Sequence, residues 1–280
     1  MQATVFFRRH LTRLGLVLLA FVYVPCGNAQ EAQWQYRFGI HDFNVEDSDT
    51  FGINGAVYAQ YQVSNYAVFS GMFEVFVDHD KDKLDPDHIP VWFKSAYDIG
   101  GNLYHFTPSW SLDWEIELQG KRNTVSSVEK QIKLFPALAA QYQGGWISAE
   151  FKTGVGYYFL EIDDDVPRLR GYDRGDFGHD SLAYTLMLRS EMDISKEVSL
   201  ALRVQSWNDE ESTTLEDQWA VALNVDTDKW VSDSHVTLSI EHTEYNLDFY
   251  AKVDLNDPNY LPIIPWDSDT LIQLSFVRPW

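Results

Sequence analysis

The sequence predicts an all-β fold, a transmembrane antiparallel β-barrel of about twelve strands, and three observations support this prediction. The first thirty residues resemble an export signal, the remainder alternates between apolar and polar residues along long segments, and the links between segments are alternately short and long. Successive side chains of a strand point to opposite faces, so each segment has one apolar and one polar face. A barrel between lipid and an enclosed interior uses both faces.

Residues 1–29 have the pattern of a cleaved signal peptide. Arg8, Arg9 and Arg13 form a basic segment, residues 14–24 are apolar and uncharged, and small residues at 27–29 offer a cleavage site. The apolar run has about eleven residues, whereas a transmembrane helix needs roughly twenty. We therefore expect an exported mature chain of residues 30–280 rather than a retained helical anchor.

Composition argues against several classes of function. Cys26, the single cysteine, lies inside the predicted signal, so the mature chain would have no disulfide, no cysteine-bound metal and no thiol nucleophile. Without the three signal arginines, the chain has 18 basic and 42 acidic residues, a net charge of −24. Nucleic-acid backbones attract the opposite charge, so we expect no nucleic-acid partner. No later segment approaches the roughly twenty consecutive apolar residues that a helical membrane protein requires.

Alternation with a period of two defines twelve expected strands. Residues 110–119 show it most clearly, with apolar residues at even positions and Ser, Asp, Glu or Gln at odd positions. Most segments are much longer than the five or six residues, roughly, of a globular strand, and they exceed the roughly nine to eleven that a tilted strand needs to cross hydrocarbon. The expected strands are residues 33–43, 51–63, 66–78, 90–105, 110–122, 127–142, 146–160, 179–193, 197–208, 217–226, 234–245 and 269–280.

The links between the expected strands alternate in length. Transmembrane barrels have short periplasmic turns and longer outside loops, and an even number of strands places both chain ends on the periplasmic side. The tight links lie at 64–65, 106–109, 143–145, 194–196 and 227–233, and the outside links at 44–50, 79–89, 123–126 (a short exception), 161–178, 209–216 and 246–268.

Aromatic residues form 15% of the sequence and concentrate near the expected strand ends. Amphipathic rings favour the interface between lipid tails and head groups, so we expect two aromatic girdles, although ordinary cross-strand pairs would account for some of these rings. The residues concerned are Trp34, Tyr61, Tyr66, Trp92, Phe106, Trp110, Tyr142, Trp146, Tyr158, Phe159, Trp207, Trp219, Trp230, Trp266 and Trp280.

The C-terminus carries apolar residues on one parity and ends on an aromatic residue; these residues are Ile272, Leu274, Phe276 and Trp280. The pattern resembles the terminal signature of bacterial outer-membrane barrels, which the barrel-assembly machinery reads. Arg278 and Pro279 depart from it, because proline cannot donate to a strand ladder. The resemblance covers the architecture of the whole mature chain and implies a Gram-negative outer-membrane location among lipid and lipopolysaccharide, with Phe276 and Trp280 as the assembly signal.

Barrels of this size and strand number include nucleoside-specific channels, acidic-sugar porins and the outer-membrane phospholipase. The resemblance does not select one of these subfamilies.

If the apolar parity faces lipid, the polar parity lines the interior. A Lys or Arg facing hydrocarbon at the midplane would cost roughly 2–4 kcal/mol, so these residues must face water or one another. The expected lumen-lining charged residues include Arg37, Glu74, Lys94, Asp98, Asp113, Glu115, Glu117, Lys133, Glu150, Lys152, Arg189, Glu191, Arg203 and Glu241.

The charges of the expected lumen are close to balance and lean acidic. Rings of basic side chains select anions, so this composition favours neutral or cationic small solutes. Asp113, Glu115 and Glu117 place three acids on one inward stripe, which could attract cations or could be neutralised by Lys133 or Lys94 on a neighbouring strand.

The expected outside loops hold dense acidic clusters, one of which ends at Glu216. Hard carboxylate oxygens can bind calcium or the divalent ions that coat lipopolysaccharide. Asp78, Asp80 and Asp82 have the alternating acids of a calcium loop, yet they lack the glycine and the closing glutamate of an EF-hand. Solvated loop charge is the simpler interpretation, and we expect neither a metal nor a cofactor.

A weak catalytic candidate is the pair His179 and Ser181, which resembles the His-x-Ser of the outer-membrane phospholipase. Side chains at i and i+2 share one strand face, so proton transfer between them is geometrically possible. Leu182 and Ala183 replace the small polar and glycine run of that family, and no asparagine follows through Asp193. The parity also turns both residues inward, away from lipid.

Together these observations favour a porin-like channel through which small hydrophilic solutes diffuse passively. Two other classes stay open. Bore grows with strand number, and twelve strands allow either an open interior or a closed, structural or adhesive barrel whose lumen charges pair. A lipid hydrolase that uses His179 and Ser181 is the third hypothesis.

Overall fold

The computed structural model describes residues 32–45, 48–79, 91–123, 128–162, 178–246 and 268–279, and the predicted signal peptide lies outside them. In these residues no helix is both long and apolar enough to cross a membrane. The strands are β1 (Gln33–Val45), β2 (Ser48–Ser64), β3 (Ala67–Asp78), β4 (Val91–Thr107), β5 (Trp110–Arg122), β6 (Val128–Gln143), β7 (Ile147–Ile162), β8 (Gly178–Asp193), β9 (Val198–Asp209), β10 (Thr214–Asp226), β11 (His235–Tyr245) and β12 (Ser268–Pro279).

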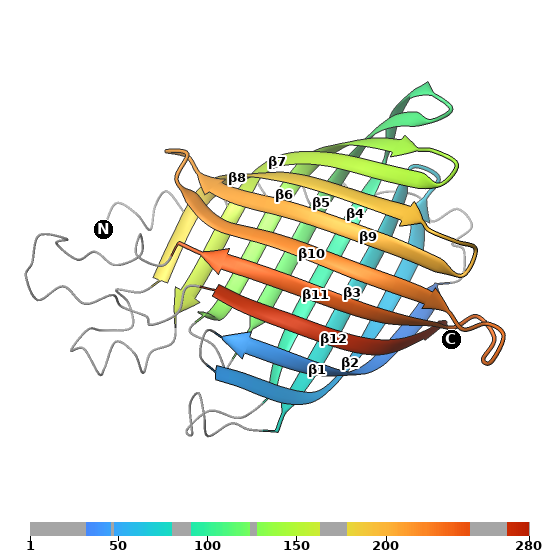
Figure 1. Cartoon of the computed structure of the whole chain (residues 1–280). Helices are drawn as coiled ribbons and strands as arrows, with labels where there is room; N and C mark the ends of the chain where they lie inside the picture. The colour runs from blue at the N-terminus through green and yellow to red at the C-terminus, as the bar shows by residue number, and fades with distance from the viewer. Residues whose placement is uncertain are drawn as a thin grey trace, which may run out of the picture.

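The strands form one closed antiparallel barrel in which each strand pairs with its neighbours in sequence (Figure 1). The last strand closes against the first, with β12 antiparallel to β1 from Gln35 opposite Pro279 to Asn44 opposite Thr270. We call the end that holds Gln33 and Pro279 the terminal end, and the opposite end the loop end. This topology confirms the prediction of a twelve-stranded antiparallel barrel. The prediction was possible because alternation over such lengths requires lipid on one strand face and an enclosed interior on the other.

The apolar parity of the strands faces outward, as predicted. Ile53, Val57, Leu188 and Leu274 expose between 46% and 61% of their surface although they lie within strands. An outward belt of large apolar side chains would be costly in water, whereas acyl chains solvate it. Phe276 also lies on this outward parity, while Trp280 falls outside the described residues.

Two predicted outside loops are shorter than expected, because the strands that flank them are longer. The 44–50 loop is wrong because β1 continues to Val45 and β2 begins at Ser48. The 209–216 loop shrinks to 210–213, since the Asp209 carboxylate accepts hydrogen bonds from the backbone N–H groups of Glu211 (2.9 Å) and Thr213 (2.8 Å). The longer links at 80–90, 163–177 and 247–267 lie outside the described residues.

The aromatic residues divide into two groups. Trp34, Tyr66, Phe106, Trp110, Trp146 and Trp230 are exposed near the terminal end, in agreement with a girdle there. For three others the prediction of an interfacial position is wrong, because Trp92, Trp207 and Tyr158 are at most 1% exposed. Each shares the parity of charged lumen residues, so its ring points into the barrel.

The interior is filled unevenly along the barrel. Toward the loop end, Phe43, Phe76, Trp92 and Leu271 form a buried cluster. Toward the terminal end, small inward residues such as Ala96, Ala201, Ala220 and Ala222 line open space. Among the described residues, the terminal half of the lumen therefore holds a large open space.

Candidate functional site in the lumen

A cavity of about 920 Å³ occupies the terminal half of the lumen, and we call it the vestibule. Its lining includes Gln33 and Gln60, which pair near the ends of β1 and β2. The predicted lumen residues that line the vestibule are Arg37, Asp98, Glu115, Glu117, Glu150, Lys152, Arg189 and Arg203. All eight lie on the polar parity of their strands.

Ion pairs in the lumen wall join strands that are not adjacent. Arg37 on β1 reaches Glu74 on β3 across Ala56 of β2, which lies opposite both in register. In the same way, Arg203 on β9 reaches Glu241 on β11 (3.1 Å) across Ala220. An alanine on the strand between leaves room for long side chains to meet above it.

Lys152 neutralises part of the predicted acidic stripe. Its Nζ lies 2.9 Å from Glu117 and 3.4 Å from Glu115, and Ala137 and Ala139 of the intervening β6 are buried beneath the pairs. The hypothesis that Lys133 or Lys94 would be the partner is wrong, since both extend toward other carboxylates. Asp113, the third acid, accepts a hydrogen bond from Asn102 (2.7 Å).

Deeper in the barrel, three lysines of consecutive strands cross the lumen to carboxylates of three consecutive strands on the far side. Lys121 on β5 pairs with Asp269 on β12 (2.7 Å) and reaches Tyr245 on β11, the strand diametrically opposite β5 in the ring of twelve. We call this set the lysine layer; its pairs are Lys94 with Glu241, Lys121 with Asp269, and Lys133 with Glu216.

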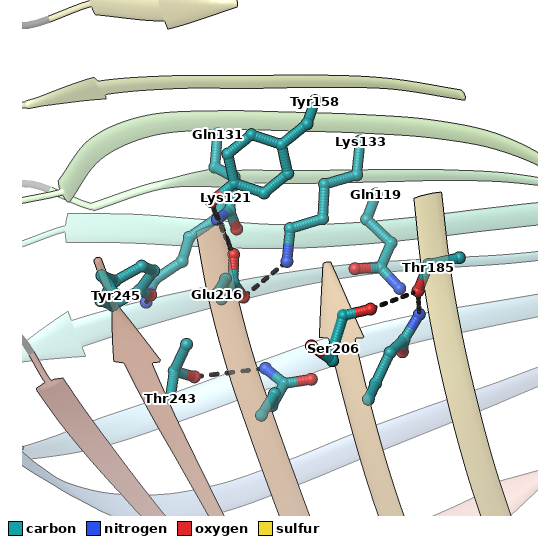
Figure 2. Close-up of polar contacts among 12 residues, drawn as sticks. Gln119, Lys121, Gln131, Lys133, Tyr158, Thr185, Ser206, Glu216, Thr243 and Tyr245 are labelled. Carbon is teal, nitrogen blue, oxygen red and sulfur yellow. Dashed lines mark hydrogen bonds and ion pairs between the residues drawn. The ribbon is translucent and has the colours of Figure 1, made fainter. Parts of the chain in front are cut away.

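Glu216 is the centre of the most buried of these contacts (Figure 2). Its carboxylate accepts from Lys133 (2.6 Å), Gln131 (2.5 Å) and Tyr158 (2.8 Å), and the residue is 1% exposed. The Lys133 ammonium also lies 3.4 Å from the centre of the Trp207 ring. The assignment of Glu216 to an outside loop is therefore wrong, because β10 begins at Thr214 rather than at residue 217.

Asp78, one of the weak metal candidates, is instead part of a buried hydrogen-bonded cluster at the loop end. It accepts from His41 Nε2 (2.8 Å), Trp92 Nε1 (2.7 Å) and Thr50 (3.2 Å). These three donors occupy the carboxylate oxygens of Asp78 that a metal ion would need. Asp80 and Asp82 lie outside the described residues, within which no group of three or more His, Cys, Asp or Glu side chains has metal-binding geometry.

The weak catalytic candidates lie on the inner face of β8. His179 and Ser181 are both half-buried, and Ser181 lies opposite Tyr158 of β7, a residue of the lumen interior. Leu182, on the other parity, is 61% exposed to the lipid side. The two residues therefore face away from a membrane substrate, as the parity argument expects.

Comparisons with known proteins relate this chain to bacterial outer-membrane barrels by fold. No protein-family model and no curated protein sequence matches the chain. Among solved structures, the NanC porin matches with a TM-score of 0.50 and 8% identity, over 86% of this chain and 98% of that one.

Two further matches are an outer-membrane channel from Pseudomonas putida F1 (0.48; 10% identity; 92% and 99% coverage) and the KdgM porin (0.45; 9% identity; 87% and 99% coverage). With its outward apolar belt and closed ring of strands, the chain is a twelve-stranded barrel of the outer-membrane, porin-like architecture.

Proposed function

We propose that the chain is an outer-membrane channel through which small hydrophilic solutes diffuse, narrowed where the lysine layer crosses the lumen. The observation that supports this proposal is the vestibule, a cavity of about 920 Å³ that is lined by eight charged side chains. A barrel with a purely structural role does not require such a cavity. Small inward residues keep this space open, and the charges keep it wet.

The solutes that fit this lumen are neutral overall or cationic. The vestibule is lined by four acidic and four basic side chains, whereas a channel for anions would show an excess of Arg and Lys. The mature chain is also strongly acidic, which lowers the local concentration of anions near the barrel.

Export and insertion are part of the proposal. Residues 1–29 would direct the chain across the inner membrane, and the terminal end would then face the periplasm, because short turns and both chain ends gather there. Phe276 and Trp280 would be read by the barrel-assembly machinery, and the acidic loops would meet lipopolysaccharide. N-terminal sequencing of the outer-membrane form tests the signal: a first residue other than Gln30 contradicts the proposed cleavage site.

A closed barrel is the second candidate, and one observation favours it. Lys133 and Glu216 have side chains only 3% and 1% exposed, so the lumen is filled at their level. In that case the cross-lumen pairs would serve rigidity rather than selectivity.

Planar-bilayer recording separates the two candidates. The channel proposal predicts discrete current steps with a mild preference for cations in a salt gradient. A folded, inserted protein without current steps would support the closed barrel, and a clear anion preference would contradict the charge argument.

A further inference from the structure

The charges that line the vestibule are segregated by sign. The lining of β4 through β7 contributes the acids Asp98, Glu115, Glu117 and Glu150 with one basic residue, Lys152. The rest of the vestibule lining contributes basic residues and no acid: Arg189, Arg203 and Arg37. The lining is therefore neutral in sum, with an acidic wall on β4 through β7. On the other wall Arg37 and Arg203 pair with Glu74 and Glu241, so within the described residues Arg189 is the basic side chain there that forms no ion pair.

The two walls meet between β7 and β8. Glu150 lies directly opposite Arg189 in the register of these strands, and the described residues form no ion pair between these two side chains. Directly opposed strand residues have Cα atoms about 4.5–5.5 Å apart. Both charges are thus within reach of one small molecule.

From these observations we propose that the vestibule binds small zwitterions of the amino-acid type. The ammonium group would lie against Glu150 and the acidic wall, and the carboxylate would accept hydrogen bonds from the Arg189 guanidinium. This inference rests on the proposed channel function and names its solute class. A neutral polyol of the same size has no separated charges and gains nothing from the two walls.

The inference is tested by swelling of liposomes that contain the purified barrel, with L-glutamine as the zwitterion and xylitol as the uncharged solute. Wild type should admit L-glutamine about threefold faster than xylitol, a preference of the size expected for one or two solvent-screened ion pairs. The double variant Glu150→Gln with Arg189→Gln removes both charges without changing the net charge. It should admit the two solutes at equal rates, with the xylitol rate unchanged.

A matched control uses a charge pair outside the lumen. Glu197 and Lys229 form an exposed ion pair (3.3 Å) in the turns at the terminal end, and their double exchange to Gln should keep the threefold preference. Equal rates of both solutes in wild type, or a preference that survives the Glu150 and Arg189 exchange, would overturn the zwitterion inference while the channel stands. Entry of neither solute would overturn the channel itself and the inference with it.

Discussion

The buried pair of Lys133 and Glu216 allows a quantitative test of the lysine layer. We consider Lys133→Met, which keeps the length of the side chain, and Glu216→Gln, which keeps its shape. In wild type the ammonium lies 2.6 Å from the carboxylate, and at an effective dielectric constant of about 20 this separation gives a Coulomb attraction of about 6 kcal/mol. Desolvation of the two ions, several kcal/mol each, offsets most of that attraction.

Removal of one partner leaves the other charge buried and unpaired. The resulting loss in the free energy of unfolding is larger than the net stabilisation that the ion pair provides. Glu216→Gln should lower the free energy of unfolding by about 3–5 kcal/mol, because the buried Lys133 then loses the carboxylate that it pairs with. Lys133→Met should cost less, about 2–3 kcal/mol, since Gln131 and Tyr158 still donate to Glu216. The double variant should lie closer to wild type than the sum of the two losses, with a coupling energy of about 3 kcal/mol.

The assay is urea unfolding in lipid vesicles, followed by tryptophan fluorescence and by gel mobility of the unheated sample. Lys229→Met with Glu197→Gln is the control, an exposed pair whose removal should change stability by at most about 1 kcal/mol. Losses below about 1 kcal/mol for both single variants, with simple additivity in the double variant, would refute the assignment of a desolvated cross-lumen pair.

Three further predictions test the lumen and the outer wall. Trp92→Ala should destabilise the barrel by about 3–5 kcal/mol and raise its conductance, whereas Trp146→Ala at the exposed rim should leave conductance unchanged; equal currents in both would contradict the placement of Trp92 in the lumen. Leu274→Arg should cost roughly 2–4 kcal/mol in urea unfolding from vesicles, because its side chain faces hydrocarbon; a neutral effect would place that face in water. Glu115→Gln with Glu117→Gln should shift the reversal potential toward anions, and an unchanged potential would remove these acids from the conducting path.

The fold could be predicted from the sequence because alternation is a local signal. A strand with one apolar and one polar face reveals its orientation within a few residues, as residues 110–119 do for β5. The positions of the strand ends were harder to predict from the sequence, because the hydrogen bonds of a tight turn have little effect on composition. The acids of the 209–216 segment predict a loop, although its last three residues belong to β10.

The partners inside the lumen could not be predicted. Which lysine meets which carboxylate depends on how the barrel closes, and Lys121 and Asp269 are 148 residues apart in sequence. For the buried residues Trp92 and Glu216 the sequence did contain a signal. Trp92 has the same strand parity as the lumen residue Lys94, and Glu216 has the same strand parity as the lumen residue Asn224. The alternation rule, applied to every residue near a strand end, therefore places both side chains inside the barrel.

Single-channel recording of the wild type beside a double variant, Lys94→Ala with Glu241→Ala, tests the central claim most directly. This variant removes one pair of the lysine layer without changing the net charge and shortens two side chains that meet across the lumen. We predict small current steps in wild type and larger ones in the variant. Folded, inserted protein that carries no current in either form would contradict the account.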